Sequence, residues 1–235
     1  MKPLIRIWPV MVLAIAVSYL FIDRPLCSFI YDHGVPQQIC ALLQIHHWPP
    51  VQSDQEIYQF SFFLQLVEWP PIMTALAPLL LLAAPFLKSG KTRNLLILTS
   101  VSILFTFALK NELKWVFSRD WPLTWTHNNL SWISNHSYGF RWFQGRPFQG
   151  TDATGSFPSG HTAIAFACFL PIGLLYYRLL PLCIALAILE GLSMVVMDYH
   201  FVSDVLAGAL VGTTCTLIVQ SLLLPRETPI QCLSA

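Results

Sequence analysis

The chain has 235 residues, of which 55% are hydrophobic and only 11% are charged, and its formal net charge is +1. An ordinary soluble domain is about 25% charged, so this chain lacks the polar side chains needed to cover itself in water. The near-neutral charge argues against a nucleic-acid-binding protein. The composition predicts a polytopic membrane protein, and the length suits a single domain over residues 1–235.

Six segments are apolar enough to cross a bilayer, whose hydrocarbon core of about 30 Å is spanned by roughly 20 helical residues. We therefore predict an all-α fold in which six transmembrane helices form one bundle. In the first segment, the only A-x-A sequence lies mid-run at residues 14–16, so we expect a retained anchor instead of a cleaved signal peptide. The approximate boundaries of the six segments are 7–23, 70–87, 94–113, 160–177, 179–197 and 202–224.

Basic residues at alternate ends of these segments predict the orientation of the chain. With six spans, these basic residues all fall on one side of the membrane. The positive-inside rule makes that side cytoplasmic, and both termini lie on it. Loops 24–69, 114–159 and 198–201 then face the periplasm or exterior of a plasma (inner) membrane. The basic residues used for this prediction are Lys2, Arg6, Lys88, Lys91, Arg93, Arg178 and Arg226. Three arginines in the 114–159 loop break the rule, and anion binding would explain them: Arg119, Arg141 and Arg146.

The six cysteines are too scattered for a disulfide scaffold, and no C-x-x-C pair suggests a metal site. Cys27 and Cys40 share one predicted external loop and either form a disulfide or remain thiols. We expect no metal and no other cofactor.

Three polar segments stand where predicted external loops meet the ends of spans, at residues 114–122, 157–162 and 199–204. Topology alone places them at one membrane surface. Ser159 is suited to cap the helix that follows it, and the N–H groups at Gly160 would then point outward at the positive end of the helix dipole. Such a helix start is a phosphate-binding site.

The side chains of these segments suit phosphoryl transfer. Lys114 and Arg119 supply positive charge for phosphate oxygens. His200 and Asp204 are four residues apart, so on a helix the carboxylate can hold one ring N–H and leave the other nitrogen free to attack phosphorus. His161 is then available to protonate the leaving oxygen.

The same segments resemble the three signatures of the type 2 phosphatidic acid phosphatase family, which shares its site with vanadium haloperoxidases. The family pattern is K-x6-R-P, then P-S-G-H, then S-R-x5-H-x3-D, and the similarity covers about residues 70–224. The resemblance implies a six-helix membrane enzyme acting on a lipid phosphate through a phosphohistidine. It implies His200 as nucleophile, Asp204 as its orienting group and His161 as general acid. The phosphate ligands that it implies are Lys114, Ser159 and Gly160.

Two positions depart from the family pattern. Trp121 occupies the arginine position of the first signature, and Met194 occupies that of the third. Arg119, Arg141 or Arg146 could replace the missing guanidinium groups, and we expect such a replacement, with Arg119 as the nearest. Two further hypotheses remain: a phosphotransferase that passes phosphate to a second lipid, and a non-catalytic lipid-phosphate binder.

Other polar and aromatic residues have structural interpretations. Lys110 fits a lysine that extends from the helix to the membrane interface. Glu190, within a span, is expected to form a structural hydrogen bond inside the bundle. The aromatic residues between Trp121 and Trp142 fit either a belt at the headgroup level or a lid over the substrate.

Overall fold

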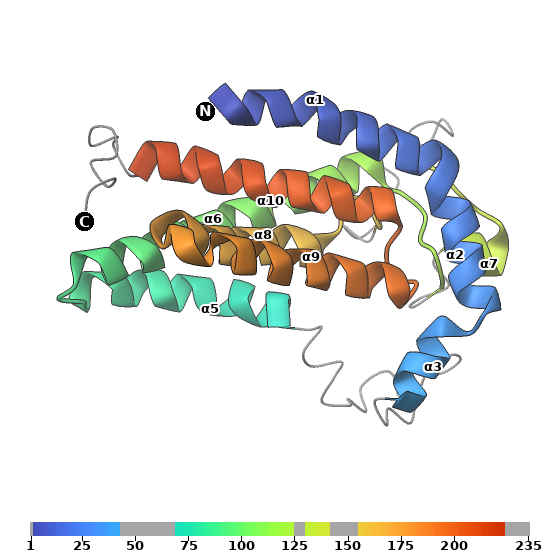
Figure 1. Cartoon of the computed structure of the whole chain (residues 1–235), viewed down its shortest axis with the longest axis horizontal. Helices are drawn as coiled ribbons and strands as arrows, with labels where there is room; N and C mark the ends of the chain where they lie inside the picture. The colour runs from blue at the N-terminus through green and yellow to red at the C-terminus, as the bar shows by residue number, and fades with distance from the viewer. Residues whose placement is uncertain (1, 43–68, 125–129, 142–154, 224–235) are drawn as a thin grey trace.

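The computed structural model describes residues 2–42, 69–124, 130–141 and 155–223. Helices make up nearly all of these residues, which confirms the predicted all-α fold (Figure 1). The described residues contain two isolated β-bridges but no strand. The helices are α1 (Lys2–Val17), the π-helical turn η1 (Ser18–Ile22), α2 (Asp23–Asp32), α3 (Val35–Leu42), α5 (Trp69–Ala83), η2 (Ala84–Phe86), α6 (Gly90–Phe117), α7 (Trp132–Asn135), α8 (Gly160–Leu175), η3 (Tyr177–Leu179), α9 (Leu180–Val196) and α10 (Val202–Leu223).

Five helical stretches of the described chain are long and apolar enough to cross a membrane. They are Ile7–Asp32, Trp69–Phe86, Gly90–Phe117, Tyr177–Val196 and Val202–Leu223. The remaining predicted span corresponds to α8, which is apolar but has 16 residues. At 1.5 Å per residue α8 is about 24 Å long, shorter than a typical hydrocarbon core.

The first helical stretch is longer than the sequence predicted. Its hydropathy falls at Asp23, where the predicted span ended, yet the helix continues to Asp32. Asp23, Cys27 and Ile30 are buried, and their spacing of four and three residues puts them on one helical face. The predicted external loop 24–69 therefore begins as helix, because this polar turn packs one face against the protein.

Helix α8 is central to the bundle and packs against α6, α9 and α10. Figure 1 shows α1 alongside α10, with α5 on the other side of the bundle next to α6. A buried cluster of small and branched side chains joins α5, α6 and α8, and its members are Ala77, Ile103, Ile164 and Ala167. The exposed apolar residues of α1, α5 and α9 face outward, as expected where helices meet lipid.

Two glycines on α10 permit unusually close packing against α8. A Cβ atom on Gly208 would lie 2.5 Å from the backbone oxygen of Ser159, and one on Gly212 would lie 2.2 Å from that of Ala163. In addition, the Ser159 N–H donates to the Asp204 carbonyl at 2.9 Å. The starts of α8 and α10 are therefore held together, and with them His161 and His200.

The polar segments come together at one end of the bundle. There α6 and α9 end, α8 and α10 begin, and α2 and α7 lie beside them (Figure 1). The opposite end carries the α5–α6 and α8–α9 connections, with Lys88, Lys91 and Arg178.

Candidate active site

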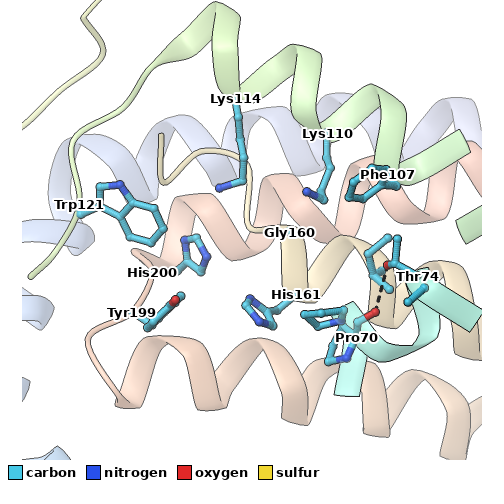
Figure 2. Close-up of a pocket in the computed structure, with 13 residues that line it drawn as sticks. Pro70, Thr74, Phe107, Lys110, Lys114, Trp121, Gly160, His161, Tyr199 and His200 are labelled. Carbon is cyan, nitrogen blue, oxygen red and sulfur yellow. Dashed lines mark hydrogen bonds between the residues drawn. The ribbon is translucent and has the colours of Figure 1, made fainter. Parts of the chain in front are cut away.

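A cavity of about 470 Å³ opens at this end of the bundle (Figure 2). One part of its wall is apolar and comes from α5, α6 and α8: Pro70, Pro71, Thr74, Ala75, Phe107 and Ile164. The other part carries the polar and aromatic groups: Lys110, Lys114, Trp121, Gly160, His161, Tyr199 and His200. The cavity thus combines a cationic, imidazole-lined region with an apolar region.

The structure brings His161 and His200 to this one cavity. His161 stands in the first turn of α8, and its Nε2 has no hydrogen-bond partner within the described residues. His200 follows α9, with its backbone N–H bonded to the Met194 carbonyl at 3.0 Å. The ring of Tyr199 lies edge-on to both imidazoles, with centroids 5.8 Å from His161 and 5.5 Å from His200.

Asp204 is positioned to orient the His200 ring. Its Oδ2 lies 3.5 Å from His200 Nδ1 and accepts the Phe201 backbone N–H at 3.1 Å. One face of the ring is covered by Trp121, which stacks on it with centroids 5.3 Å apart and planes inclined by 29°. The imidazole thus has an indole on one face and a carboxylate near its Nδ1.

The start of α8 has the geometry that the sequence predicted. Ser159 is the N-cap, and its Oγ accepts the Thr162 N–H at 3.4 Å. Gly160 lines the cavity beside it. Because Gly160 has no side chain of its own, an anion could approach the backbone closely, next to the Lys110 side chain.

Two lysines from α6 line the cavity. Lys114 is 7% exposed and its Nζ donates to the Gly155 carbonyl. Lys110, one turn earlier, passes over Gly160, where a Cβ atom would lie 3.2 Å from its Cδ. Lys110 was interpreted from the sequence as an interface lysine, but in the structure it belongs to the cavity wall.

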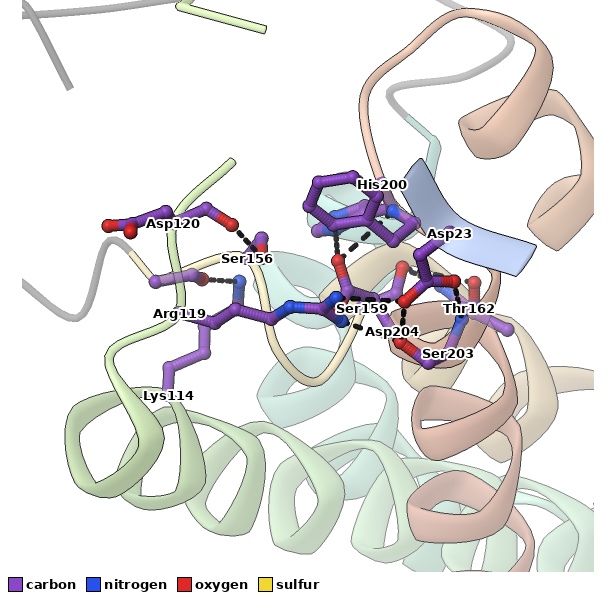
Figure 3. A network of polar contacts seen from close by, with 12 residues as sticks. Asp23, Lys114, Arg119, Asp120, Ser156, Ser159, Thr162, His200, Ser203 and Asp204 are labelled. Carbon is purple, nitrogen blue, oxygen red and sulfur yellow. Dashed lines mark hydrogen bonds and ion pairs between the residues drawn. The ribbon is translucent and has the colours of Figure 1, made fainter. Parts of the chain in front are cut away.

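Arg119 lies outside the lining of this cavity. Its Nη2 is 2.8 Å from Asp23 Oδ2, and its Nη1 forms an ion pair with Asp204 Oδ1 (Figure 3). The residue is 1% exposed. In the structure, Arg119 contacts two carboxylates. Its role as a phosphate ligand, which the sequence suggests, stays a prediction.

Arg141, another replacement candidate, is also absent from the residues that line the cavity. Arg141 Nε lies 3.6 Å from Asp120 Oδ1. Arg146 lies outside the described residues. At the departing family positions, Trp121 lines the cavity, while Met194 is buried in the bundle.

Burial and neighbouring charge set the electrostatics of the loop residues. Burial lowers the pKa of His200 to about 4, although the Asp204 carboxylate raises it. For Arg119, burial lowers the pKa but the carboxylates of Asp204 and Asp23 outweigh that effect, so its pKa is raised. His200 is therefore a neutral imidazole at ordinary pH, and Arg119 is a permanent cation.

Two further expectations can be compared with the structure. Glu190 accepts the Trp69 indole N–H at 3.2 Å, which is the structural hydrogen bond predicted for it. Cys27 is a free, buried thiol, whereas the side chain of Cys40, its possible disulfide partner, lies outside the part of the chain that the structure describes. Within the described residues, no group of three or more His, Cys, Asp or Glu side chains could hold a metal ion.

Sequence reasoning missed two site residues besides Lys110. Tyr199 lines the cavity and its ring contacts both histidines, but an aromatic residue at a span end gave no functional signal. Asp23 did give one, because an acidic residue in a membrane helix is a functional candidate. Asp23 was assigned no role because the predicted span 7–23 ends at this residue.

A known protein family matches the part of the chain that contains most of the cavity residues. The sequence model of the PAP2 superfamily matches residues 95–226, more than half of the chain. The matched region includes both histidines, Asp204 and both cavity lysines.

Two similar proteins are each named lipid A 1-phosphatase. The protein from Rhizobium johnstonii (strain DSM 114642 / LMG 32736 / 3841) is 32% identical over 117 residues, which cover 50% of this chain and 43% of the relative. The protein from Rhizobium etli (strain ATCC 51251 / DSM 11541 / JCM 21823 / NBRC 15573 / CFN 42) is 33% identical over 111 residues, covering 47% and 43%. The matched region therefore spans less than half the length of either relative.

Among solved structures, the chain resembles the crystal structure of the first transmembrane PAP2 type phosphatidylglycerolphosphate phosphatase from Bacillus subtilis. The sequence identity is 18%, the TM-score is 0.35, and the alignment covers 89% of this chain and 94% of that one.

Proposed function

Because the chain belongs to the PAP2 superfamily, we propose that it is a membrane phosphatase that hydrolyses a lipid phosphomonoester or diphosphate without a metal ion. The observation that carries this proposal is the shared cavity, in which His161 and His200 face one space together with Lys110 and Lys114. Two imidazoles and two cations are the groups that histidine-based phosphoryl transfer requires.

The proposed reaction has two steps. In the first, His200 Nε2 attacks phosphorus while Asp204 holds the Nδ1–H, so an N–P bond forms and the P–O bond to the leaving group breaks. His161 donates a proton to the departing oxygen. In the second, water attacks the phosphohistidine, His161 accepts its proton, and inorganic phosphate leaves with His200 restored.

Phosphate binding is assigned to the start of α8 and to α6. The N–H groups at Gly160, capped by Ser159, would face the phosphate oxygens, and Lys114 would add one positive charge. Lys110 would add the second, which suits a phosphate that carries up to two negative charges at neutral pH. Arg119 would reach the phosphate only after leaving its two carboxylates, so it has no primary ligand role in this proposal.

The substrate class follows from the two-part cavity and its place in the bundle. The apolar wall formed by α5 lies beside the cationic region, so a phosphate attached to an acyl or isoprenyl chain could fill both. We place this site at the outer headgroup level of the inner membrane, in keeping with the distribution of basic residues. Because both similar Rhizobium proteins are named lipid A 1-phosphatase, a phosphorylated glycolipid is the first substrate to test.

The test measures phosphate release by purified protein in mixed micelles containing lipid A, phosphatidate, phosphatidylglycerol phosphate or an isoprenyl diphosphate. The wild-type protein is expected to hydrolyse at least one lipid and to keep its activity with a chelator present. His200→Ala should reduce release to background, and His161→Ala should reduce it by about 100-fold or more.

His136→Asn is the matched control, because His136 is an exposed histidine of a loop and asparagine tolerates its positive φ of 54°. Unchanged release by His200→Ala would falsify the mechanism. Mass analysis of the lipids also tests the transferase hypothesis, since transfer to a second lipid would conserve lipid-bound phosphate.

The missing family arginines are the specific observation that favours the non-catalytic alternative. Trp121→Arg restores the first of them within the cavity wall. If the wild-type chain is inactive towards every lipid and this variant gains activity, the chain is a lipid-phosphate binder. The phosphatase proposal expects the substitution to lower activity, because Trp121 stacks on His200.

A further inference from the structure

Behind the cavity, a buried polar cluster connects the first membrane helix to the Asp204 carboxylate (Figure 3). Asp23 Oδ2 receives the Arg119 Nη2–H at 2.8 Å, and its Oδ1 accepts the backbone N–H of Ser203 at 3.0 Å. Arg119 Nη1 donates to the Ser203 Oγ at 2.6 Å and to Asp204 Oδ1. One guanidinium therefore bridges Asp23 and Asp204, and all three charged groups are at most 1% exposed.

The contacts of Asp204 divide between its two oxygens. Oδ1 is held by Arg119, while Oδ2 accepts the Phe201 N–H and faces His200 Nδ1 at 3.5 Å. With one oxygen bound by a rigid planar donor, the other is held in place beside the imidazole. Arg119 thus holds the carboxylate that lies beside the histidine.

The charge of Asp23 complements this arrangement. Paired with Arg119 alone, the Asp204 carboxylate would be neutralised and would support the imidazole less. Asp23 shares the guanidinium, so the three groups carry a net charge of −1 directly behind His200. This charge stabilises the cationic imidazole that forms whenever Nε2 is bonded to phosphorus and Nδ1 keeps its proton.

The position of Asp23 in the chain adds an independent observation. Asp23 lies well before the region 95–226 that matches the family. It directly follows the π-helical turn η1, and such turns occur frequently at functional sites. Tyr138 ties the same region down, because its hydroxyl donates to the Tyr19 carbonyl of η1 at 2.6 Å and accepts from Arg119 at 2.9 Å.

We propose that Asp23, acting through Arg119, positions the Asp204 carboxylate and thereby His200, so that the first membrane helix completes the active site. This inference rests on the proposed function for its kinetic test. Asp23 and Arg119 are positioning residues: neither lines the cavity, and each acts through a neighbour.

The experiment compares Asp23→Asn, Arg119→Gln and the double variant in full-length protein. Asp32→Asn is the matched control, since Asp32 is an exposed acid on the same helix α2. We expect each single variant to lower kcat about tenfold or more while KM for the lipid stays within about twofold. The double variant should be no slower than the slower single variant, because the two residues act as one unit.

A second readout needs no turnover. Inorganic phosphate reports on the cavity cations, whereas orthovanadate, which can bond to an attacking nitrogen, reports on the readiness of His200. From thermal-shift titrations in detergent, Asp23→Asn should bind vanadate about tenfold more weakly and phosphate within about twofold of wild type. Weaker vanadate binding in a chain that hydrolyses no lipid would support the inference while the phosphatase proposal fails.

Opposite results would overturn the inference. If Arg119→Gln raises KM and weakens phosphate binding while kcat is unchanged, Arg119 is a phosphate ligand. If Asp23→Asn behaves like Asp32→Asn, the first helix has no part in the site. Thermal unfolding identifies any variant that does not fold. If Arg119→Gln does not fold, Arg119→Lys replaces it, because lysine keeps the charge but lacks the planar fork of the guanidinium. The same loss of kcat is expected for Arg119→Lys.

Discussion

His200 is 2% exposed, and the environment around this one ring determines whether it can act as a nucleophile. Burial lowers the pKa of His200 to about 4, although the Asp204 carboxylate raises it. An imidazole is nucleophilic only when its attacking nitrogen is unprotonated. The lowered pKa therefore keeps nearly all of His200 in the unprotonated, reactive form at ordinary pH.

The activity is accordingly expected to show an acid limb near pH 4. Measured from about pH 3.5 to about pH 8, kcat/KM should fall as the pH drops through the His200 pKa. Between about pH 4 and about pH 6.5, the unfolded chain binds the extra proton, so the stability contributed by this buried neutral ring is lost as the pH falls through that window.

Asp198 supplies the control for this pH profile. Burial raises its pKa to about 7, while a hydrogen bond from Cys27 lowers it. Asp198→Asn removes this second titration and should leave the acid limb in place. An acid limb that lies near pH 7 and disappears in Asp198→Asn would assign the titration to this carboxyl group instead of His200.

Because Lys110 lines the cavity, we expect its charge to contribute to phosphate binding. Lys110→Gln should lower kcat/KM for the lipid about 10- to 100-fold, because a charged hydrogen bond to phosphate contributes about 1.5–3 kcal/mol. Lys91→Gln is the control, since Lys91 lies on the same helix α6 at the opposite end of the bundle. Equal activities of the two variants would remove Lys110 from the site.

At the scale of elements, the packing of α8 against α10 sets the separation of the two imidazoles. His161 is in the first turn of α8 and His200 immediately precedes α10, so a shift of either helix moves one ring relative to the other. Gly208 and Gly212 allow the two backbones to approach closely. The geometry of the site therefore depends on residues that touch no substrate.

Gly212→Ala tests this dependence. The added methyl group would lie 2.2 Å from the Ala163 carbonyl oxygen, so the helices must separate. We expect a loss of about 1–3 kcal/mol in the free energy of unfolding and a lower kcat. Gly90→Ala is the control, because a Cβ atom there meets nothing within 4 Å; if both variants unfold and react like wild type, the close contact is not needed.

Sequence patterns predicted these elements to different degrees. Hydropathy located the apolar helices, because lipid-facing and buried residues are both apolar in a membrane bundle. It failed at Asp23, where a single buried charge ended the predicted span although the helix continues to Asp32. The cap at Ser159 was predictable from local chemistry.

The partners of Arg119 were not predictable in the same way. Its sequence position beside Trp121 suggested a phosphate ligand, whereas its ion pairs join residues 96 and 85 positions away. Contacts of that kind depend on how three helices pack. The cavity position of Lys110 has the same origin, since it requires the approach of α6 to Gly160.

At the scale of the whole molecule, the cavity combines a charged region at one end of the bundle with an apolar region along α5. A substrate that fills both must be amphipathic, with its phosphate near the imidazoles and its chain against α5. This arrangement favours lipids over small phosphate esters, because only a lipid gains from burying apolar area along α5.

Ala75→Trp is expected to distinguish these substrate classes. Ala75 lines the apolar wall, and an indole there would fill the part of the cavity in which we expect the lipid chain to bind. Its kcat/KM for the preferred lipid should fall about tenfold or more, while hydrolysis of a short, water-soluble phosphomonoester stays within about threefold. An equal loss for both substrates would mean that the apolar wall does not hold the lipid.

The proposed function depends on a covalent bond between His200 and the phosphate of a lipid. Rapid quenching of the enzyme with a lipid carrying ³²P in its phosphate measures this directly. The mechanism predicts transient protein-bound label that survives alkali, is lost in acid and maps to the peptide containing His200, with no label on His200→Ala. Lipid hydrolysis without such a labelled intermediate, or label on another residue, would contradict it.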